Sequence, residues 1–187
     1  MNKIGILLGS TRPGRNGGSV ARWAYEVASK RKDAEYELVD IAEYRLPLLD
    51  EPMPPIMGQY TKPHTKAWSE KIDSFDGYIF ITPNYNRGTS GALKNAIDFL
   101  FKEWNHKAAG LVGYGGSEGN SAIDSLRLSL SELKVATVRS QLSLSLRTDF
   151  ENYSQFKPTS HHEKMMDAIL DEVLAWSTAL KTLRVTV

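Results

Sequence analysis

Three segments of the chain are apolar almost throughout and lack the alternation of a half-exposed strand. They cover residues 3–8, 77–82 and 108–114, and each is followed at once by glycine or proline. Continuous apolar strands are typical of parallel sheets whose two faces are both covered by helices. Residues 35–41 carry more charge, and residues 135–146 alternate between apolar and polar side chains. We therefore place these two segments at the edges of the same sheet.

Between these strands, apolar residues recur at helical spacing. Pro63 can open one such helix, and an apolar stripe that runs as far as Trp104 predicts another. The stripes are formed by Val20, Trp23, Ala24 and Val27; by Trp68, Ile72 and Phe75; by Leu93, Ile97, Leu100 and Trp104; by Ile123, Leu126, Leu130 and Leu133; and by Met166, Ile169, Leu170, Val173 and Leu174. Five strand–helix units in one chain of this length predict an α/β fold with a doubly wound, five-stranded parallel sheet.

Helix starts and connections complete the predicted organisation. Three helices are expected to begin with side-chain caps, which are Thr89 or Ser90, Ser121 with Asp124, and Ser160 with Glu163. The one long irregular stretch, residues 45–66, contains five prolines, and we interpret it as a surface loop. The chain shows no internal repeat and no second domain, so residues 1–187 are predicted to form a single domain.

Composition narrows the chemistry that this domain can perform. The formal net charge of the 187 residues is +1, which gives no long-range attraction to nucleic acid or to a membrane surface. The absence of cysteine excludes thiol chemistry and thiolate metal sites, so redox chemistry requires a bound cofactor. The four histidines are isolated or adjacent, and we predict no metal site. No segment approaches the ~20 apolar residues of a membrane helix, and we expect a cytoplasmic protein.

The loop at residues 9–19 follows the first strand and leads into the first helix. It combines glycines, hydroxyl groups, Arg12 and Arg15 with the free amides of a helix start. Such amides, at the positive end of the helix dipole, form a natural anion site, and an arginine adds a charge-assisted bond. The loop therefore predicts a phosphate site.

Two common phosphate-binding motifs do not fit this loop. In a Walker A motif, Lys and Ser or Thr would stand where the chain has Arg15 and Asn16, and both are needed to hold phosphates and Mg²⁺. A dinucleotide fingerprint requires a second glycine, where the chain has Thr11. Asp40 at the end of the second strand resembles a ribose-binding acid, but a solvated edge residue explains it equally.

Two further loops follow the next two buried strands. Residues 82–91 offer Tyr85 and two asparagines, and residues 114–120 contain three glycines with no bulky side chain between them. A planar heteroaromatic ligand needs a flat or aromatic wall and polar groups along its edge. Ligands of open α/β sheets bind beyond the carboxyl ends of the strands, where the strand order reverses. The three loops together predict an FMN site in a flavodoxin-like sheet of order 2-1-3-4-5.

These loops also resemble those of a known family, the NADPH-dependent FMN reductases. The resemblance covers about residues 3–145 and rests on LLGSTRPGR, LPLLDEPMPP, TPNYNRGTSGALKNAIDF and VGYGGSEG. The stretch from Tyr85 to Asp98 is the most specific part. Asn84 stands where the family usually has Glu, and Ser90 where it has Pro.

The resemblance implies the site and its chemistry. Hydride from NADPH or NADH would pass to FMN and then, in the same cleft, to a small acceptor such as a quinone, an azo compound, a flavin or a metal oxyanion. It implies no catalytic side chain, and it implies a homodimer or homotetramer. The cofactor-binding residues would be Ser10, Arg12, Gly17, Gly18 and Ser19 at the phosphate, and Pro83, Asn84, Tyr85, Asn86, Gly115, Gly116 and Ser117 at the ring.

Two other functions remain open from the sequence. A flavodoxin-type electron carrier would share the fold, but such carriers are strongly acidic and lack an arginine in the phosphate loop. A nucleotide-binding protein without a redox role would bind no FMN.

Overall fold

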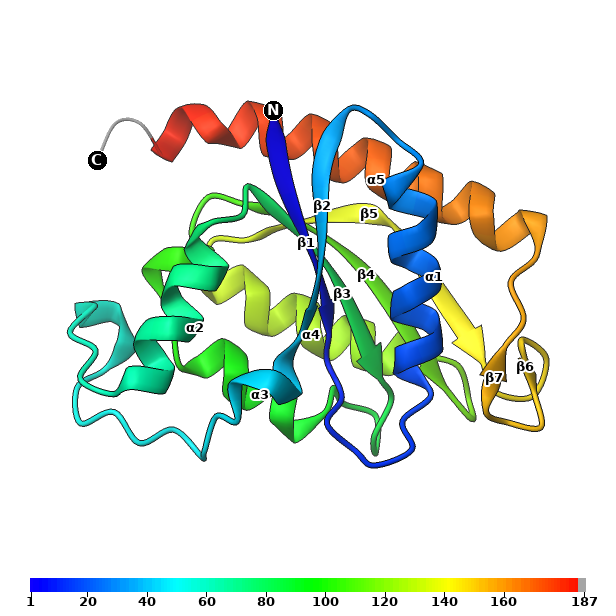
Figure 1. Ribbon diagram of the computed structural model, residues 1–187, viewed down its shortest axis with the longest axis horizontal. Coiled ribbons are helices and arrows are strands. Elements are labelled where there is room, and N and C mark those ends of the chain that lie inside the picture. The colour runs from blue at the N-terminus through cyan, green and yellow to red at the C-terminus, as the bar shows by residue number, and fades with distance from the viewer. Residues whose placement is uncertain (185–187) are drawn as a thin grey trace.

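The computed structural model describes residues 1–184 and contains one five-stranded parallel sheet, in the order β2-β1-β3-β4-β5 (Figure 1). The strands are β1 (Asn2–Leu8), β2 (Ala34–Asp40), β3 (Gly77–Pro83), β4 (Ala108–Gly115) and β5 (Ala136–Ser145). The helices are α1 (Gly17–Ser29), α2 (Pro63–Asp73), α3 (Gly91–Asp98), α4 (Asn120–Glu132) and α5 (Ser160–Leu180). The predicted fold class and strand order are confirmed.

The sheet separates two apolar layers. Helices α1 and α5 cover one face, and α2, α3 and α4 cover the other. Every residue of β3 and β4 is buried, because strands covered on both sides must be apolar on both sides. Ile79 and Ile81 point toward α1 and α5, whereas Tyr78 and Phe80 point toward the opposite layer.

The predicted long helix from Leu93 to Trp104 is wrong in its extent. Helix α3 ends at Asp98, and a short 3₁₀ turn, η3 (Lys102–Trp104), follows it. Trp104 nevertheless stays buried, because its indole nitrogen donates to the Ile97 carbonyl at 3.1 Å. The apolar stripe therefore reflects a chain that folds back onto the same face.

Helix caps were predicted with mixed success. The hydroxyl of Ser90 accepts a bond from the Leu93 amide at 3.0 Å and caps α3, as predicted. Helix α4 begins after Gly119 without a side-chain cap, so the predicted cap by Ser121 is wrong. The capping box of α5 is formed by Thr159 and His162, one residue earlier than Ser160 and Glu163. The His162 imidazole takes the role predicted for the Glu163 carboxylate, because its Nδ1 accepts a hydrogen bond from the Thr159 amide at 3.0 Å.

Two connections shape the edges of the domain. The irregular stretch after β2 contains two 3₁₀ turns, η1 (Ile41–Tyr44) and η2 (Pro55–Met57), and it lies on the surface as expected. The chain between β5 and α5 forms a small hairpin of β6 (Phe150–Glu151) and β7 (Gln155–Phe156), which the sequence did not predict. Phe150 and Phe156 are buried and fix this hairpin against the core. Within residues 1–184, no helix has both the length and the apolar character needed to cross a membrane.

Candidate functional site

The loops that follow β1, β3 and β4 meet beyond the carboxyl ends of these strands, at the bottom of Figure 1. They enclose a cleft of about 360 Å³, within the roughly 300–1,000 Å³ of small-molecule sites. Six of the predicted site residues line it, namely Arg12, Pro83, Asn84, Tyr85, Gly115 and Gly116. The remaining wall is formed by Gly14, Arg15, Asn16, Tyr114, Leu146 and Tyr153.

Two arginines of the first loop have different surroundings. The guanidinium of Arg15 donates to the Ser10 carbonyl and forms an ion pair with Asp40. The Asp40 carboxylate therefore accepts hydrogen bonds from Arg15 and from the Ala42 amide, so it is not simply a solvated residue at the sheet edge. Arg12 is exposed, and its side chain has no hydrogen-bond or ion-pair partner within residues 1–184. Arg12 is thus the cation of this loop that is free to bind an anion.

The start of α1 presents backbone amides without a side-chain cap. Asn16 stands at the N-cap, but its amide nitrogen donates to the Tyr153 carbonyl at 2.7 Å instead. Unpaired amides at a helix start, together with the helix dipole, favour an anion. Gly17 is buried there, Gly18 borders a neighbouring hollow, and the Ser19 hydroxyl donates to the Asn16 carbonyl at 2.8 Å.

The loop after β3 brings Asn84 and Tyr85 to the cleft. The Asn84 side chain donates to the Glu118 carbonyl at 2.9 Å, and its buried Oδ1 has no partner within residues 1–184. The Tyr85 hydroxyl lies 3.2 Å from the buried Ser10 hydroxyl, so Ser10 supports the wall from behind rather than lining it. Asn86 lies in the tight turn closed by Tyr85 and Gly88 and is not among the residues that line the cleft.

The loop after β4 forms the opposite wall with two glycines. A Cβ atom on Gly115 would lie 2.9 Å from the Asn84 Cβ, so the two loops touch only because Gly115 has no side chain. At Gly116 no atom lies within 4 Å of such a Cβ, and the backbone faces open space. Ser117 is exposed and does not line the cleft. This wall can lie flat against a planar ring.

Tyr114 is the site residue that the sequence reading missed. It was counted as a strand residue, yet its hydroxyl reaches the first loop, where a Cβ on Gly17 would lie 2.5 Å from it. Burial raises the pKa of Tyr114 to about 12, so the group is a neutral phenol at physiological pH. Its buried hydroxyl forms no hydrogen bond of normal geometry within the described chain, although the Ser10 side chain and the Gly17 backbone lie near it. Buried polar groups normally have partners, and this one is available to a ligand.

The residues present fit FMN. The first loop and the strand residue beside it offer the Arg12 guanidinium, uncapped amides and the Tyr114 hydroxyl, which suit a phosphate. The loops after β3 and β4 offer the Tyr85 ring, the flat Gly115–Gly116 backbone and the unpaired Asn84 Oδ1, which suit the faces and edge of a heteroaromatic ring.

Comparison with known proteins agrees with this geometry. Residues 2–149 match the family described as NADPH-dependent FMN reductase. The chain belongs to that family. Its membership confirms the predicted class, an NAD(P)H-dependent oxidoreductase with FMN as cofactor.

Individual relatives support the assignment. An NAD(P)H-dependent FMN reductase named ntnL, from Nectria sp, is 41% identical over 158 residues, which are 80% of this chain and 79% of the relative. An NAD(P)H-dependent FMN reductase of Schizosaccharomyces pombe is 40% identical over 149 residues, 79% of this chain and 74% of the relative. The solved structure of FerB, a flavoenzyme NAD(P)H:(acceptor) oxidoreductase from Paracoccus denitrificans, superposes with a TM-score of 0.73 at 17% identity, covering 96% and 98% of the two chains.

Proposed function

We propose that this FMN reductase family member passes hydride from NADPH or NADH through FMN to a small acceptor, by a ping-pong mechanism in one cleft. The observation that carries the proposal is the cleft itself, whose lining combines a free cation, an unpaired phenol and a flat backbone wall. The acceptor class comprises quinones, azo compounds, flavins and metal oxyanions.

In this proposal the chain binds and orients the cofactor. Arg12, the Tyr114 hydroxyl and the amides of Gly17 and Gly18 hold the phosphate, since the Ser19 amide already donates to the Asn16 carbonyl. Asn84, Tyr85 and the Gly115–Gly116 backbone hold the ring. FMN, when bound, accepts hydride and passes on the electrons, and this is chemistry that no side chain of the protein supplies.

No acid–base residue is assigned to the reaction. The residues that line the cleft include no carboxylate and no imidazole. The Tyr114 phenol keeps its proton at physiological pH because its pKa is raised to about 12. It can therefore donate a hydrogen bond to phosphate throughout the reaction cycle without taking part in proton transfer.

Steady-state kinetics tests this function against the electron-carrier alternative. The purified protein with FMN should oxidise NADPH in the presence of a quinone, with parallel double-reciprocal lines when both substrates are varied. An electron carrier would show no NADPH oxidation until a partner reductase is added, and that result would overturn the proposal.

We also propose that the protein works as a cytoplasmic homodimer or homotetramer. The segment between β2 and α2 exposes apolar side chains, among them Leu48, Leu49 and Met53. Exposed apolar side chains gathered on one segment favour contact with another protein surface. Light scattering after size-exclusion chromatography should give twice or four times the chain mass of 20.9 kDa, and a monomer at all concentrations would contradict this.

A further inference from the structure

A second and larger hollow lies away from the cleft, beside the turns that lead into the amino ends of β4 and β5. Its volume is about 670 Å³, compared with about 360 Å³ for the cleft. Most of its wall is formed by Asp73 at the end of α2 and by Phe101, Lys102, Asn105, His106, Lys107 and Lys134. It shares no lining residue with the cleft, so a ligand bound here would not compete with the cofactor.

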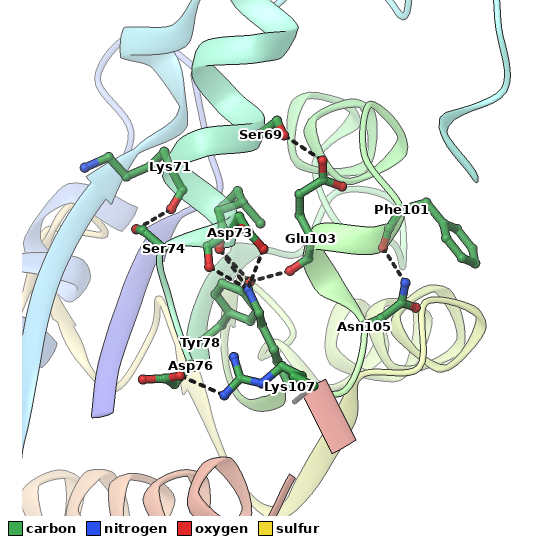
Figure 2. A network of polar contacts seen from close by, with 12 residues as sticks. Ser69, Lys71, Asp73, Ser74, Asp76, Tyr78, Phe101, Glu103, Asn105 and Lys107 are labelled. Atoms are coloured by element: carbon green, nitrogen blue, oxygen red, sulfur yellow. Dashed lines mark hydrogen bonds and ion pairs between the residues drawn. The ribbon is translucent and has the colours of Figure 1, made fainter. Parts of the chain in front are cut away.

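The floor of this hollow is held by Lys107. Only 2% of its side chain is exposed, and its Nζ lies 3.1 Å from the carbonyls of Ile72 and Asp73 and from the Tyr78 hydroxyl (Figure 2). These three bonds use all three hydrogens of the ammonium group. Lys107 therefore gives the floor a positive charge while its own hydrogen bonds are satisfied by the protein.

The rim of the hollow is also basic. Lys102, His106, Lys134 and Arg184 line it, and Asp73 is the one carboxylate among the lining residues. Asp73 lies 3.8 Å from the Lys107 ammonium. Within residues 1–184, the ammonium groups of Lys102 and Lys134 form no ion pair. Arg184 is paired with Asp76, so the charges of Lys102 and Lys134 are the ones at the hollow that no carboxylate of the described chain balances.

Two buried polar atoms at the wall have no partner in the described part of the chain. Asn105 donates its side-chain nitrogen to the Phe101 carbonyl at 3.1 Å, which leaves Oδ1 unpaired. Arg184 donates one terminal nitrogen to Asp76 at 2.7 Å, which leaves Nε unpaired. Since buried polar groups usually have partners, the wall offers one acceptor and one donor to a bound molecule.

We propose that this hollow binds a small organic anion that carries an apolar group and at least one hydroxyl or N–H. The lysines and the Arg184 Nε recognise the anionic group, the Asn105 Oδ1 accepts the hydroxyl or N–H, and Ile56 with Phe101 covers the apolar part. Helix stabilisation accounts for Lys107, because its ammonium caps the last carbonyls of α2. It does not account for the two unpaired atoms or for the unpaired lysines at the rim.

Salicylate is a suitable probe, because it combines a carboxylate, a hydroxyl group and an aromatic ring. Its neutral analogue salicylamide keeps the ring and the hydroxyl group. We would titrate each compound into the ¹⁵N-labelled protein, with and without FMN, and follow the backbone amide resonances. Salicylate should shift the amides of residues 101–107 and of Lys134, with at least tenfold weaker binding for salicylamide.

Charge variants show which residues carry the binding. A Lys102→Gln/Lys134→Gln variant should bind salicylate at least tenfold more weakly, while a Lys30→Gln/Lys164→Gln control, with the same loss of charge elsewhere on the surface, should bind it unchanged. Their unperturbed amide spectra serve as the check on folding.

Several results would overturn the proposal. These are no shifts up to 10 mM salicylate, equal binding of salicylamide, shifts confined to the FMN cleft, or equal weakening in the control variant. A chain that ends at Arg184 should bind salicylate with unchanged affinity. If its affinity rises tenfold or more, residues 185–187 rather than a small anion are the natural occupant of the hollow. The titration follows amides that line the hollow and is done both with and without FMN. Its result therefore does not depend on whether the proposed reductase activity is found.

Discussion

Two tyrosines on neighbouring strands show how the two ends of the sheet differ. The Tyr78 hydroxyl on β3 contacts the Ile72 carbonyl at 2.9 Å, the Glu103 carbonyl at 3.2 Å and the Lys107 ammonium at 3.1 Å (Figure 2). The Tyr114 hydroxyl on β4 is also buried but forms no hydrogen bond of normal geometry within residues 1–184. A buried hydroxyl whose bonds are all internal supports the fold, whereas one without a partner marks a place for a ligand.

The close contact of Gly17 with Tyr114 gives the largest expected effect. Gly17→Ala should weaken FMN binding about 100-fold, or about 2.7 kcal/mol, because the new methyl group would lie 2.5 Å from the Tyr114 hydroxyl. Gly18→Ala is the matched control, since its Cβ would be 3.5 Å from the nearest atom. Flavin fluorescence titration measures both.

A double variant locates the cause of that effect. Removing the hydroxyl in Gly17→Ala/Tyr114→Phe should restore about tenfold of the lost affinity. If Gly18→Ala is as damaging as Gly17→Ala, or if the double variant regains nothing, the Tyr114 contact is not the reason.

The two tyrosines should respond in opposite ways to loss of the hydroxyl. Tyr78→Phe should lower the free energy of unfolding by about 1–3 kcal/mol, because Lys107 and two carbonyls lose a buried partner, and FMN affinity should stay unchanged. Tyr114→Phe should leave the free energy of unfolding within about 0.5 kcal/mol and weaken FMN binding severalfold. Urea denaturation and flavin titration of both variants provide the test, and equal effects on stability would remove the distinction.

The buried ammonium group of Lys107, near the amino ends of the strands, predicts that the free energy of unfolding depends on pH. Burial lowers the pKa of Lys107 from 10.5 to about 8. The unfolded chain therefore binds more protons than the folded protein between these values, and stability rises with pH. From pH 8 to 9.5, below the range in which the buried tyrosines titrate, the gain should be about 1–2 kcal/mol. Lys107→Met should flatten this rise in urea denaturation, and an equal rise in the variant would exclude Lys107 as its source.

A tenfold effect on FMN binding should separate the two arginines of the first loop. Arg12→Ala should weaken FMN binding about tenfold, or about 1.4 kcal/mol, because its guanidinium is the one free to meet the phosphate. Riboflavin, which lacks the phosphate, should bind the variant and the parent protein equally. Equal losses for both ligands would place Arg12 away from the phosphate.

The sequence predicted the sheet well because its central strands are apolar on both faces. Residues 3–8, 77–82 and 108–114 differ from β1, β3 and β4 by one residue at an end. The end of α3 at Asp98 was missed, because Trp104 packs on the same face through a 3₁₀ turn. The spacing of apolar residues predicts which face of the protein they pack against. It does not show whether one continuous helix joins them.

The sequence predicted that three loops meet beyond the carboxyl ends of the strands, but not all the contacts that they make there. Glycine-rich loops after buried strands indicated where the cleft lies, and its role as the FMN site stays a prediction. The pairing of Arg15 with Asp40 depends on residues 25 positions apart, and the hairpin that brings Tyr153 to the cleft has strands of two residues each. Contacts of this kind form through tertiary packing and leave no local pattern in the chain.

Titration of the purified protein with FMN tests the central claim most directly. The account predicts one FMN per chain, with quenched flavin fluorescence, amide shifts at Asn16, Tyr85 and Gly116, and bleaching of the bound flavin by NADPH in the absence of oxygen. A colourless protein whose spectrum and amide resonances ignore added FMN would contradict it.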